Sequence, residues 1–419
     1  MDQEQIIAEA EEILTRRYGG TQTLGEVQRL GGSGVASVFR ARVSNNPFLQ
    51  HRTVVVKYSP ETGNVLEDAA FLREVVAYQF TTSLSEDVRP GPVLLGYDID
   101  QRIVIISDSG EGDTLATLLD SADEEQHVQL LRNLGTALGR MHVGSAGRED
   151  AFDVLFAQAA RQRSGADTMQ HLRERLLAHR FDFGLDMLER SGLDVPTEVR
   201  LTAANVRKRL FKGGSRAFTP FDLSPDNIIY ADRTQFLDYE WAGFRDVSFD
   251  VAFVVAGFPL YVSAWGYSDV AIEAFISAWV QEVRGIWPAF LHEDTLHARI
   301  TGAMVAWALS SLSVMGQFTV AELAASDAEL AQELIDAGVA PHSERLTAQG
   351  EAASGAETLH GGSDILRPQS QGPFTEEEQL VRRDLQETFE ALAAFAGTGR
   401  DTAYLVIADF ARTVAKRFA

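Results

Sequence analysis

The residues with the clearest capacity for chemistry lie in one short stretch of the chain. Asp222 is followed five residues later by Asn227, and a second apolar segment leads to Asp238 and Glu240. Three carboxylates and an amide within nineteen residues supply the oxygen ligands that Mg²⁺ prefers, and Mg²⁺ usually completes its coordination with water and substrate phosphates. We expect the second apolar strand to present Asp238 and Glu240 on one face, because residues two apart share a face of a strand.

A second group of residues could hold phosphates. In the segment Gly32-Ser33-Gly34, backbone N–H groups can approach phosphate oxygens with no Cβ in the way. Lys57 ends a run of three valines and is the only lysine before Lys208, in a chain with four lysines among 37 basic residues. Such use of lysine favours a compact ammonium group, which Glu74 could hold. Two plainer interpretations stay open, a simple hairpin turn for the glycines and a solvated helix face for Glu74.

A small sheet and a long helix must position these residues. The spacing of apolar residues predicts an N-terminal helix and then a change to the two-residue period of strands. The first two strands enclose the glycine-rich turn, and the third strand ends at Lys57. The predicted elements are a helix over Gln3–Arg17, strands over Val27–Leu30, Ala36–Val43, Thr53–Lys57, Pro92–Tyr97 and Arg102–Ser107, and a helix over Asn64–Ser83.

The rest of the chain is predicted to be mainly helical. Residues 150–212 have helical patterns with breaks at Gly165, Gly184 and Gly192, and a short β-like passage covers 218–239. Residues 338–373 have the composition of a flexible loop or linker, and Thr375–Glu378 forms a capping box. The expected fold class is α+β with two lobes. The expected units are 1–107, a small lobe with the residues that could hold phosphates; 108–337, a helical lobe with Asp222 and Asn227; 338–373, the linker; and 374–419, a helical extension on that lobe.

The composition restricts the partners. The chain has 419 residues and a net charge of −23, which opposes binding to nucleic acid and to anionic membranes. There is no cysteine, so disulfides and thiolate chemistry are excluded. Two uncharged runs, Val251–Tyr267 and Ile300–Ala321, are interpreted as buried core helices rather than membrane spans. A cytoplasmic protein with a cationic small-molecule partner fits these observations.

Over about residues 20–337, these motifs resemble the aminoglycoside phosphotransferase/choline kinase-like family, small-molecule kinases with a two-lobed protein-kinase-like fold. The segment Gly32–Arg40 resembles the nucleotide loop of that family. The resemblance implies that Lys57 binds the nucleotide phosphates and pairs with Glu74. Ile106–Gly110 resembles the hinge between the lobes, so Ser107 and Ser109 are expected beside the nucleotide.

The family's catalytic loop, His-Gly-Asp-x4-Asn, corresponds to Pro220-Phe221-Asp222-x4-Asn227. The resemblance implies that Asp222 is the catalytic base and that Asn227 and Asp238 are metal ligands, with Glu240 and Asp250 in support. Pro220 and Phe221 depart from the family's His and Gly, which puts the loop geometry and the catalytic rate in question. His142 is expected to pack rather than to react.

The function that follows is an ATP- and Mg²⁺-dependent transfer of the γ-phosphate to a hydroxyl of a small molecule, with GTP not excluded as the donor. An aminoglycoside or an amino alcohol is the type of acceptor that the net charge favours. Two alternatives stay open. One is a nucleotide-binding pseudokinase or regulatory module, and the other is an atypical kinase-fold enzyme that modifies a protein or transfers AMP. The sequence does not indicate the oligomeric state.

Overall fold

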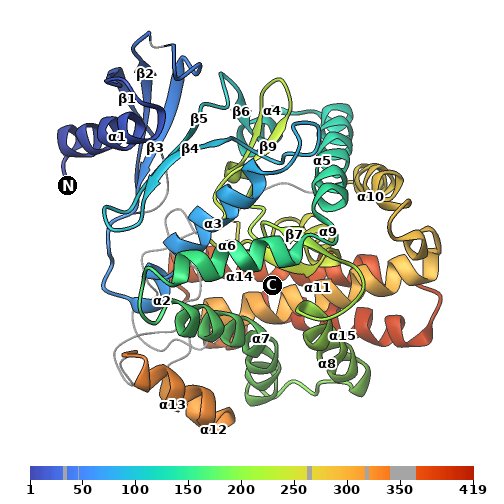
Figure 1. The fold of residues 1–419 in the computed structure, drawn as a ribbon. Coiled ribbons are helices and arrows are strands. Elements are labelled where there is room, and N and C mark those ends of the chain that lie inside the picture. The colour runs from blue at the N-terminus through green and yellow to red at the C-terminus, as the bar shows by residue number, and fades with distance from the viewer. Residues whose placement is uncertain (32–34, 46, 262–266, 317–319, 340–364) are drawn as a thin grey trace.

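A small antiparallel sheet forms the first part of the computed structural model, which describes residues 1–31, 35–45, 47–261, 267–316, 320–339 and 365–419 (Figure 1). The five strands are ordered β1-β2-β3-β5-β4. The elements of this N-lobe are α1 Gln3–Tyr18, β1 Leu24–Leu30, β2 Ser37–Val43, β3 Thr53–Tyr58, α2 Val65–Asp68, α3 Ala70–Thr82, β4 Leu94–Asp98 and β5 Ile103–Ser107. All five predicted strands are present, and β1 and β2 form the predicted hairpin.

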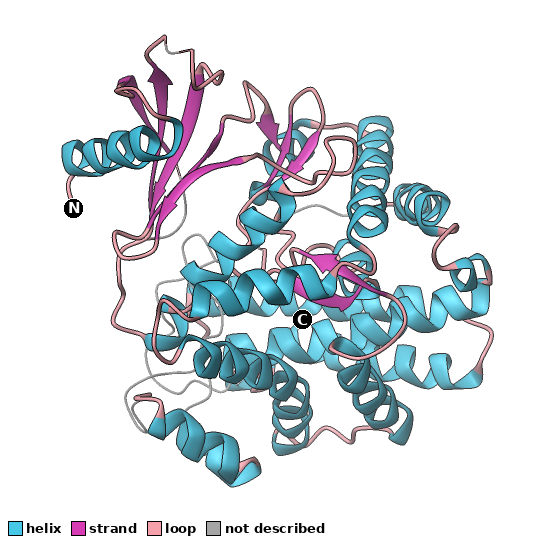
Figure 2. Ribbon diagram, in the orientation of Figure 1, coloured by secondary structure: helices cyan, strands magenta, loops and turns pink. Residues whose placement is uncertain are grey.

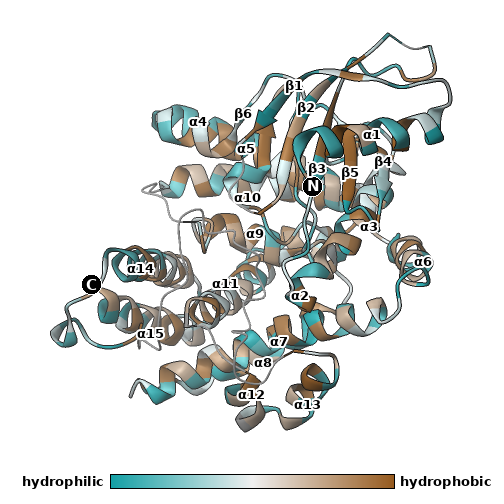
Figure 3. Cartoon of the chain, turned by 90° about the vertical axis from the view of Figure 1, so that its left-hand side faces the viewer, coloured by the Kyte–Doolittle hydropathy of each residue, from teal (hydrophilic) through white to brown (hydrophobic). Residues whose placement is uncertain are grey.

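Both faces of the sheet are covered by helices. Ile103 and Ile105 of β5 belong to the core beneath α1, whereas Val104 and Ile106 belong to the core that includes α3. This alternation follows from the two-residue period of a strand. The strands β3 and β5 are accordingly hydrophobic along most of their length (Figure 3). The sheet is therefore a rigid support for residues at the end of β3.

The remainder of the chain is mostly helical, with two small sheets near its junction with the N-lobe (Figure 2). The predicted fold class, a small β-rich lobe followed by a large helical lobe, is confirmed. The helical lobe contains β6 Asp113–Thr114, α4 Leu115–Ser121, α5 Glu124–Ser145, α6 Glu149–Ala160, α7 Ala166–Arg190, α8 Thr197–Leu210, β7 Arg216–Thr219, η1 Pro225–Asn227, β8 Ile228–Tyr230, β9 Thr234–Phe236, β10 Gly243–Asp246, α9 Ser248–Val255, α10 Asp269–Val283, η2 Pro288–Leu291, α11 Glu293–Gly316, α12 Val320–Ser326, α13 Ala328–Asp336, η3 Gln369–Gln371, α14 Glu376–Ala396 and α15 Thr402–Phe418.

Helix α11 lies among α7, α8, α9 and α14. It is the one helix in the described part of the chain that is long and apolar enough to cross a membrane, and 78% of its apolar window is buried inside the protein. Trp307 of this helix is 2% exposed and donates a hydrogen bond to the carbonyl oxygen of Phe249. The buried environment agrees with the predicted core helix.

Two local predictions in the helical regions are wrong. Gly184 does not break a helix but lies inside α7, where a Cβ would come within 2.3 Å of the carbonyl oxygen of Leu309. Glycine is used there because it allows α7 and α11 to approach closely. The single helix predicted over Asn64–Ser83 is divided in two at Ala69, into α2 and α3.

The C-terminal helices pack on the helical lobe. Residues 340–364 of the predicted linker lie outside the described residues, and Ile365 and Leu366 after them are each 1% exposed. The predicted capping box of Thr375 and Glu378 is confirmed at the start of α14. Asp384 of α14 accepts a hydrogen bond from the backbone N–H of Leu260, so this extension is attached to the loop after α9. The division of the chain at residues 107, 337 and 373 stays a prediction.

Candidate active site

The ammonium group of Lys57 joins the two lobes. Its Nζ lies 2.8 Å from Glu74 Oε1 on α3 and 3.0 Å from Asp238 Oδ1, which follows β9 in the helical lobe. The pairing with Glu74 agrees with the expectation, whereas the sequence did not predict the contact with Asp238. Burial alone would lower the pKa of Lys57, but the carboxylates of Asp238 and Glu74 raise it well above its ordinary value. The lysine is therefore a fixed positive charge.

Burial has the opposite effect on Glu74, which is 2% exposed. Burial raises the pKa of its carboxyl group, and the nearby Asp238 raises it further, while Lys57 opposes the rise. The two acids consequently compete for one cation. A bound divalent cation near Asp238 would relieve this competition, because it would supply positive charge that the chain itself lacks at this point.

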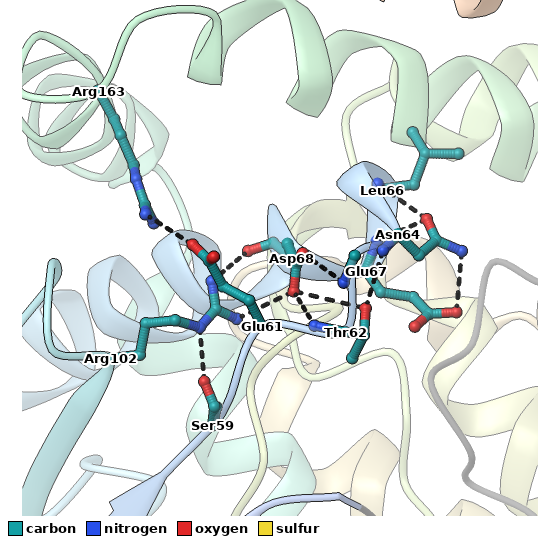
Figure 4. Close-up of polar contacts among 10 residues, drawn as sticks. Ser59, Glu61, Thr62, Asn64, Leu66, Glu67, Asp68, Arg102 and Arg163 are labelled. Atoms are coloured by element: carbon teal, nitrogen blue, oxygen red, sulfur yellow. Dashed lines mark hydrogen bonds and ion pairs between the residues drawn. The ribbon is translucent and has the colours of Figure 1, made fainter. Parts of the chain in front are cut away.

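A network of polar contacts surrounds Asp68, between the end of β3 and α2 (Figure 4). Arg102 donates hydrogen bonds to the carbonyl oxygens of Ser59 and Asp68, and its guanidinium also lies 3.6 Å from the Asp68 carboxylate. The same carboxylate accepts from the backbone N–H of Thr62 at 2.9 Å. These contacts join the segment after β3 to α2, the short helix that precedes the one with Glu74.

The hairpin of β8 and β9 brings Asn227 and Asp238 to the same end of a small sheet. The backbone N–H of Leu237 donates to the carbonyl oxygen of Asn227 at 2.8 Å. Asp238 has a φ of 57°, in the left-handed region that non-glycine residues rarely adopt and that often marks functional sites. The turn aims its carboxylate at Lys57.

Asp238 and Glu240 do not share a strand face, contrary to expectation. Strand β9 ends at Phe236, and both acids lie in the loop that follows. Asp238 contacts Lys57, whereas Glu240 lines a pocket with Arg173 and Trp241. The prediction failed because the apolar segment leading to Asp238 ends in a left-handed turn, which breaks the two-residue period of a strand.

Asp222 lies in a buried loop before η1. Its Oδ1 accepts hydrogen bonds from the backbone N–H of Ser224 at 3.0 Å and from the Ser224 hydroxyl at 2.5 Å. Burial raises the pKa of Asp222 to about 6, with the Ser224 hydrogen bonds opposing the rise and the charge of Asp238 adding to it. A carboxylate with that pKa is ionised at neutral pH and is still basic enough to accept a proton.

The loop that carries Asp222 has an unusual backbone. Phe221 has a φ of 68°, the conformation for which glycine is suited, so the residue that departs from the family pattern stands at a position that favours glycine. Its ring compensates by packing 4.8 Å from Trp307 and 5.8 Å from Phe249, centroid to centroid. The loop geometry is thus retained by aromatic packing.

Asp250 and His142 brace this loop from behind. Burial raises the pKa of Asp250, and hydrogen bonds from His142 and from the Phe221 backbone oppose that rise. Trp279 Nε1 donates to His142 Nδ1 at 3.0 Å, and because an indole can only donate, the histidine proton is on Nε2, which faces Asp250 Oδ2 at 3.2 Å. His142 is fully buried, in keeping with the packing role expected for it.

The structure describes only some of the other residues that are expected to bind the nucleotide. Gly32, Ser33 and Gly34 lie outside the described residues. The hydroxyl of Ser107 accepts a hydrogen bond from the backbone N–H of Val93, and Ser109 is bonded to Gln235 of β9. The segment after β5 therefore runs from the N-lobe sheet to the β8–β9 hairpin, which is where a hinge between the lobes would lie.

The donor set fits a magnesium ion of the expected kind. No group of three or more acidic or histidine side chains in the described residues is arranged to hold a metal by itself. Mg²⁺ commonly takes one or two carboxylates and obtains its other ligands from water and phosphates. An amide and a carboxylate at one end of the hairpin, Asn227 and Asp238, match that requirement.

A group of buried arginines beside this site was not predicted from the sequence. Arg73, Arg173 and Arg245 are each 5% exposed or less and gather with Glu240 and Trp241 around one pocket. The signal in the sequence is Arg73 within the apolar run Ala70–Val76, where an ordinary surface charge would not be placed.

Comparisons with known proteins show structural similarity only. No family model and no curated protein matches the chain. The structure is similar to aminoglycoside phosphotransferase APH(2'')-Ib bound to ADP, with 15% identity, 80% of this chain and 98% of that chain covered, and a TM-score of 0.43. It is similar to choline kinase from Cryptosporidium parvum Iowa II at 13% identity, with 81% and 98% covered and a TM-score of 0.42. Amicoumacin kinase hAmiN, in complex with AMP-PNP, Ca²⁺ and Ami, has 13% identity, coverage of 81% and 95%, and a TM-score of 0.38. The function proposed below rests on the positions of this chain's own residues.

Proposed function

We propose that the protein is an ATP-dependent phosphotransferase that acts on a hydroxyl group of a small molecule. One observation carries the proposal. Lys57 on the N-lobe sheet lies within 3.0 Å of both Glu74 and Asp238, which is 181 residues away in the chain. A lysine held between a helix carboxylate and a second acid, at the junction of two lobes, is the arrangement that phosphoryl transfer needs for clamping phosphates next to a metal.

In this mechanism the chain positions the reactants and neutralises charge. Lys57 contacts the nucleotide phosphates, with Glu74 holding its ammonium in place. We assign phosphate binding to the glycine-rich segment of Gly32, Ser33 and Gly34, and contact with the base to the segment that contains Ser107 and Ser109. Asp222 accepts a hydrogen bond from the acceptor hydroxyl and takes its proton as the phosphoryl group is transferred.

A bound magnesium ion would supply positive charge beside the phosphate groups. Asn227 and Asp238 would hold it, with Glu240 in a supporting position two residues after Asp238. Asp250 has a positioning role, because it contacts the backbone of Phe221 rather than the reactants. We expect the enzyme to be soluble and cytoplasmic.

The test is consumption of ATP with a panel of hydroxyl compounds, together with thermal shifts on adding Mg²⁺ and ATP. We expect a shift and turnover on at least one acceptor. Asp222→Asn should reduce kcat by about 10² to 10⁴, the contribution typical of general base catalysis, and leave the nucleotide-induced shift nearly unchanged. Turnover at the wild-type rate in Asp222→Asn would contradict the assignment of the base.

The same experiment separates the proposal from a pseudokinase. Phe221 in a conformation that favours glycine is the observation that keeps the pseudokinase in view, since loop strain could prevent turnover. A thermal shift with Mg²⁺ and ATP but no ATP consumption on any acceptor would support the pseudokinase and contradict the enzyme.

A further inference from the structure

Three guanidinium groups are buried together between α3, α7 and β10. Arg73, Arg173 and Arg245 are 5%, 3% and 2% exposed, in a protein whose net charge is −23. They line a pocket together with Leu177 and four polar or aromatic residues, Gln170, Glu174, Glu240 and Trp241. We call Arg73, Arg173 and Arg245 the arginine cluster. Arginines are almost never fully buried unless they are paired, so the cluster requires an explanation.

The chain does not supply enough negative charge for the cluster. Arg73 pairs with Glu174 at 2.7 Å, but Arg173 donates to the backbone carbonyl of Glu240 and Arg245 to that of Trp241. Backbone carbonyls accept hydrogen bonds without neutralising a charge. Burial and the like charge of Arg73 together lower the pKa of Arg245 to about 9, although the carboxylates of Glu174 and Asp250 oppose the change. The guanidinium groups are thus desolvated with partial compensation only, which is costly.

Glu240 does not restore the balance. Its carboxyl group lines the same pocket but forms no ion pair with the three arginines among the described residues. Glu174 is the one carboxylate that forms an ion pair with a member of the cluster among these residues. Even when Glu174 and Glu240 are counted together, three guanidinium groups outnumber the carboxylates that line the pocket.

Several N–H donors at the cluster also have no acceptor. Arg73 Nε, Arg245 Nε and Trp241 Nε1 are buried without a hydrogen-bond partner in the part of the chain that the structure describes. The Nη1 atoms of Arg73 and Arg245 each lie 3.2 Å from the position that a Cβ would take at Gly243, so the two guanidinium groups meet across this glycine. Unsatisfied buried donors and unbalanced positive charge at one place are both corrected by the same ligand, an anion with several oxygen acceptors.

We propose that the arginine cluster binds an oxyanion, a carboxylate or a phosphate, that belongs to the acceptor substrate. The inference rests on the proposed phosphotransferase function. Two contacts connect the cluster to the reacting groups. Arg245 lies 4.6 Å over the ring of Phe221, the residue before Asp222, and Glu240 lies two residues after Asp238. The acceptor is then an anionic hydroxyl compound rather than the cationic one that the net charge suggested.

The geometry of arginine suits this ligand. A guanidinium group presents parallel N–H donors that match the two oxygens of a carboxylate or phosphate. Arg173 is held over the ring of Trp241 at 4.2 Å, so its plane is fixed before a ligand arrives. The side chains as they stand leave no free space between them, so binding of an oxyanion requires the guanidinium groups to move apart.

The direct test measures binding of inorganic phosphate by calorimetry, with Mg²⁺ and a non-hydrolysable ATP analogue present to fill the nucleotide site. We expect Arg173→Gln to weaken binding at least tenfold. Glu174→Gln should instead tighten it several-fold, because it removes the one carboxylate that competes for Arg73. A gain of affinity cannot come from a folding defect, so this variant keeps the test valid if Arg173→Gln is unstable. Arg16→Gln, at an exposed ion pair, is the matched control.

The second arm compares acceptors in matched pairs, glycerate and glycerol phosphate against glycerol, and gluconate against gluconamide. We expect ATP consumption with the anionic members, and the preferred glycerol derivative identifies the group as carboxylate or phosphate. Phosphate binding that Arg173→Gln and Glu174→Gln leave unchanged would overturn the proposal, as would turnover of neutral or cationic acceptors alone. ATP consumption without phosphate binding refutes the cluster's role and leaves the phosphotransferase standing. Phosphate binding at the cluster without turnover of any acceptor refutes the phosphotransferase itself.

Discussion

Two buried basic regions lie side by side in this protein and are balanced in opposite ways. Lys57 has two carboxylates, Glu74 and Asp238, within 3.0 Å of one ammonium group. The arginine cluster has one ion-paired carboxylate, Glu174, for three guanidinium groups. The first region carries an excess of negative charge and the second an excess of positive charge.

The difference indicates what each region lacks. An excess of carboxylates at Lys57 suits a divalent cation, and an excess of guanidinium groups suits an oxyanion. The global charge of −23 predicts neither, because charges at a few ångströms in a buried site outweigh distant, screened ones. The net charge alone therefore does not decide the charge of the acceptor.

The largest effect is expected at Asp238. Asp238→Ala removes the carboxylate that faces both Lys57 and the metal position, so turnover should fall by at least about 10³, in line with the loss of a main electrostatic contribution. Steady-state ATP consumption with a working acceptor measures it. Asp232→Asn, an exposed acid in the turn between β8 and β9, should keep wild-type activity. Activity within tenfold of wild type in Asp238→Ala would remove this residue from the mechanism.

The next largest effect is expected on the stability of the fold, where substitutions in the two regions should have opposite signs. Lys57→Met leaves Glu74 and Asp238 together with no cation between them, so the free energy of unfolding should fall by about 3 kcal/mol. Urea denaturation measures this. The double variant Lys57→Met/Glu74→Gln should recover most of the stability and none of the activity. If the single variant were as stable as the wild type, Lys57 would not be the group that balances these acids.

The pH dependence of activity should arise from the carboxyl group of Asp222. Burial raises the pKa of Asp222 to about 6, so below pH 6 this acid is protonated and cannot accept the proton of the acceptor. We expect kcat/KM to fall about tenfold per pH unit below 6. Ser224→Ala removes the hydroxyl hydrogen bond that lowers this pKa, and the acidic limb should then move to higher pH. A limb that stays in place would mean that another group controls it.

The smallest effect is expected next to the arginine cluster. Arg180 is 2% exposed, its Nη2 has no hydrogen-bond partner, and burial and the charge of Arg173 lower its pKa to about 9. Replacing a poorly balanced buried charge by an apolar group is often neutral or stabilising. Arg180→Met should therefore change the free energy of unfolding by between zero and about 1 kcal/mol in the stabilising direction, the opposite sign to Lys57→Met. Marked destabilisation in urea would show that Arg180 is balanced after all.

The sequence was sufficient to predict the strands of the N-lobe and the helix with Glu74, and to single out Lys57. The periods of two and 3.6 residues predict the five strands and the helix with Glu74, because apolar patterning directly reports which face is buried. The rarity of lysine singled out Lys57, and its pairing with Glu74 follows from a strand and a helix that are adjacent in the chain.

Contacts between distant segments could not be derived in this way. The contact of Asp238 with Lys57 depends on a left-handed turn at an aspartate, for which no residue pattern gives a signal. The arginine cluster is assembled from α3, α7 and β10, three elements far apart in sequence. Arg173 and Arg245 each resemble a surface charge in an arginine-rich chain, and Arg73 alone gives a signal. Gly184 was misread as a helix break for a related reason, since its partner Leu309 lies 125 residues away.

The backbone of Phe221 has a consequence for how the protein responds to heat and to mutation. Its left-handed conformation costs about 1 to 2 kcal/mol, and the rings of Trp307 and Phe249 are what keep it in place. The reactive loop and the aromatic interior of the helical lobe therefore share one residue. Substitutions deep in that interior should slow turnover before they measurably lower the stability of the fold. The rate of turnover is then a sensitive measure of how well the core is packed.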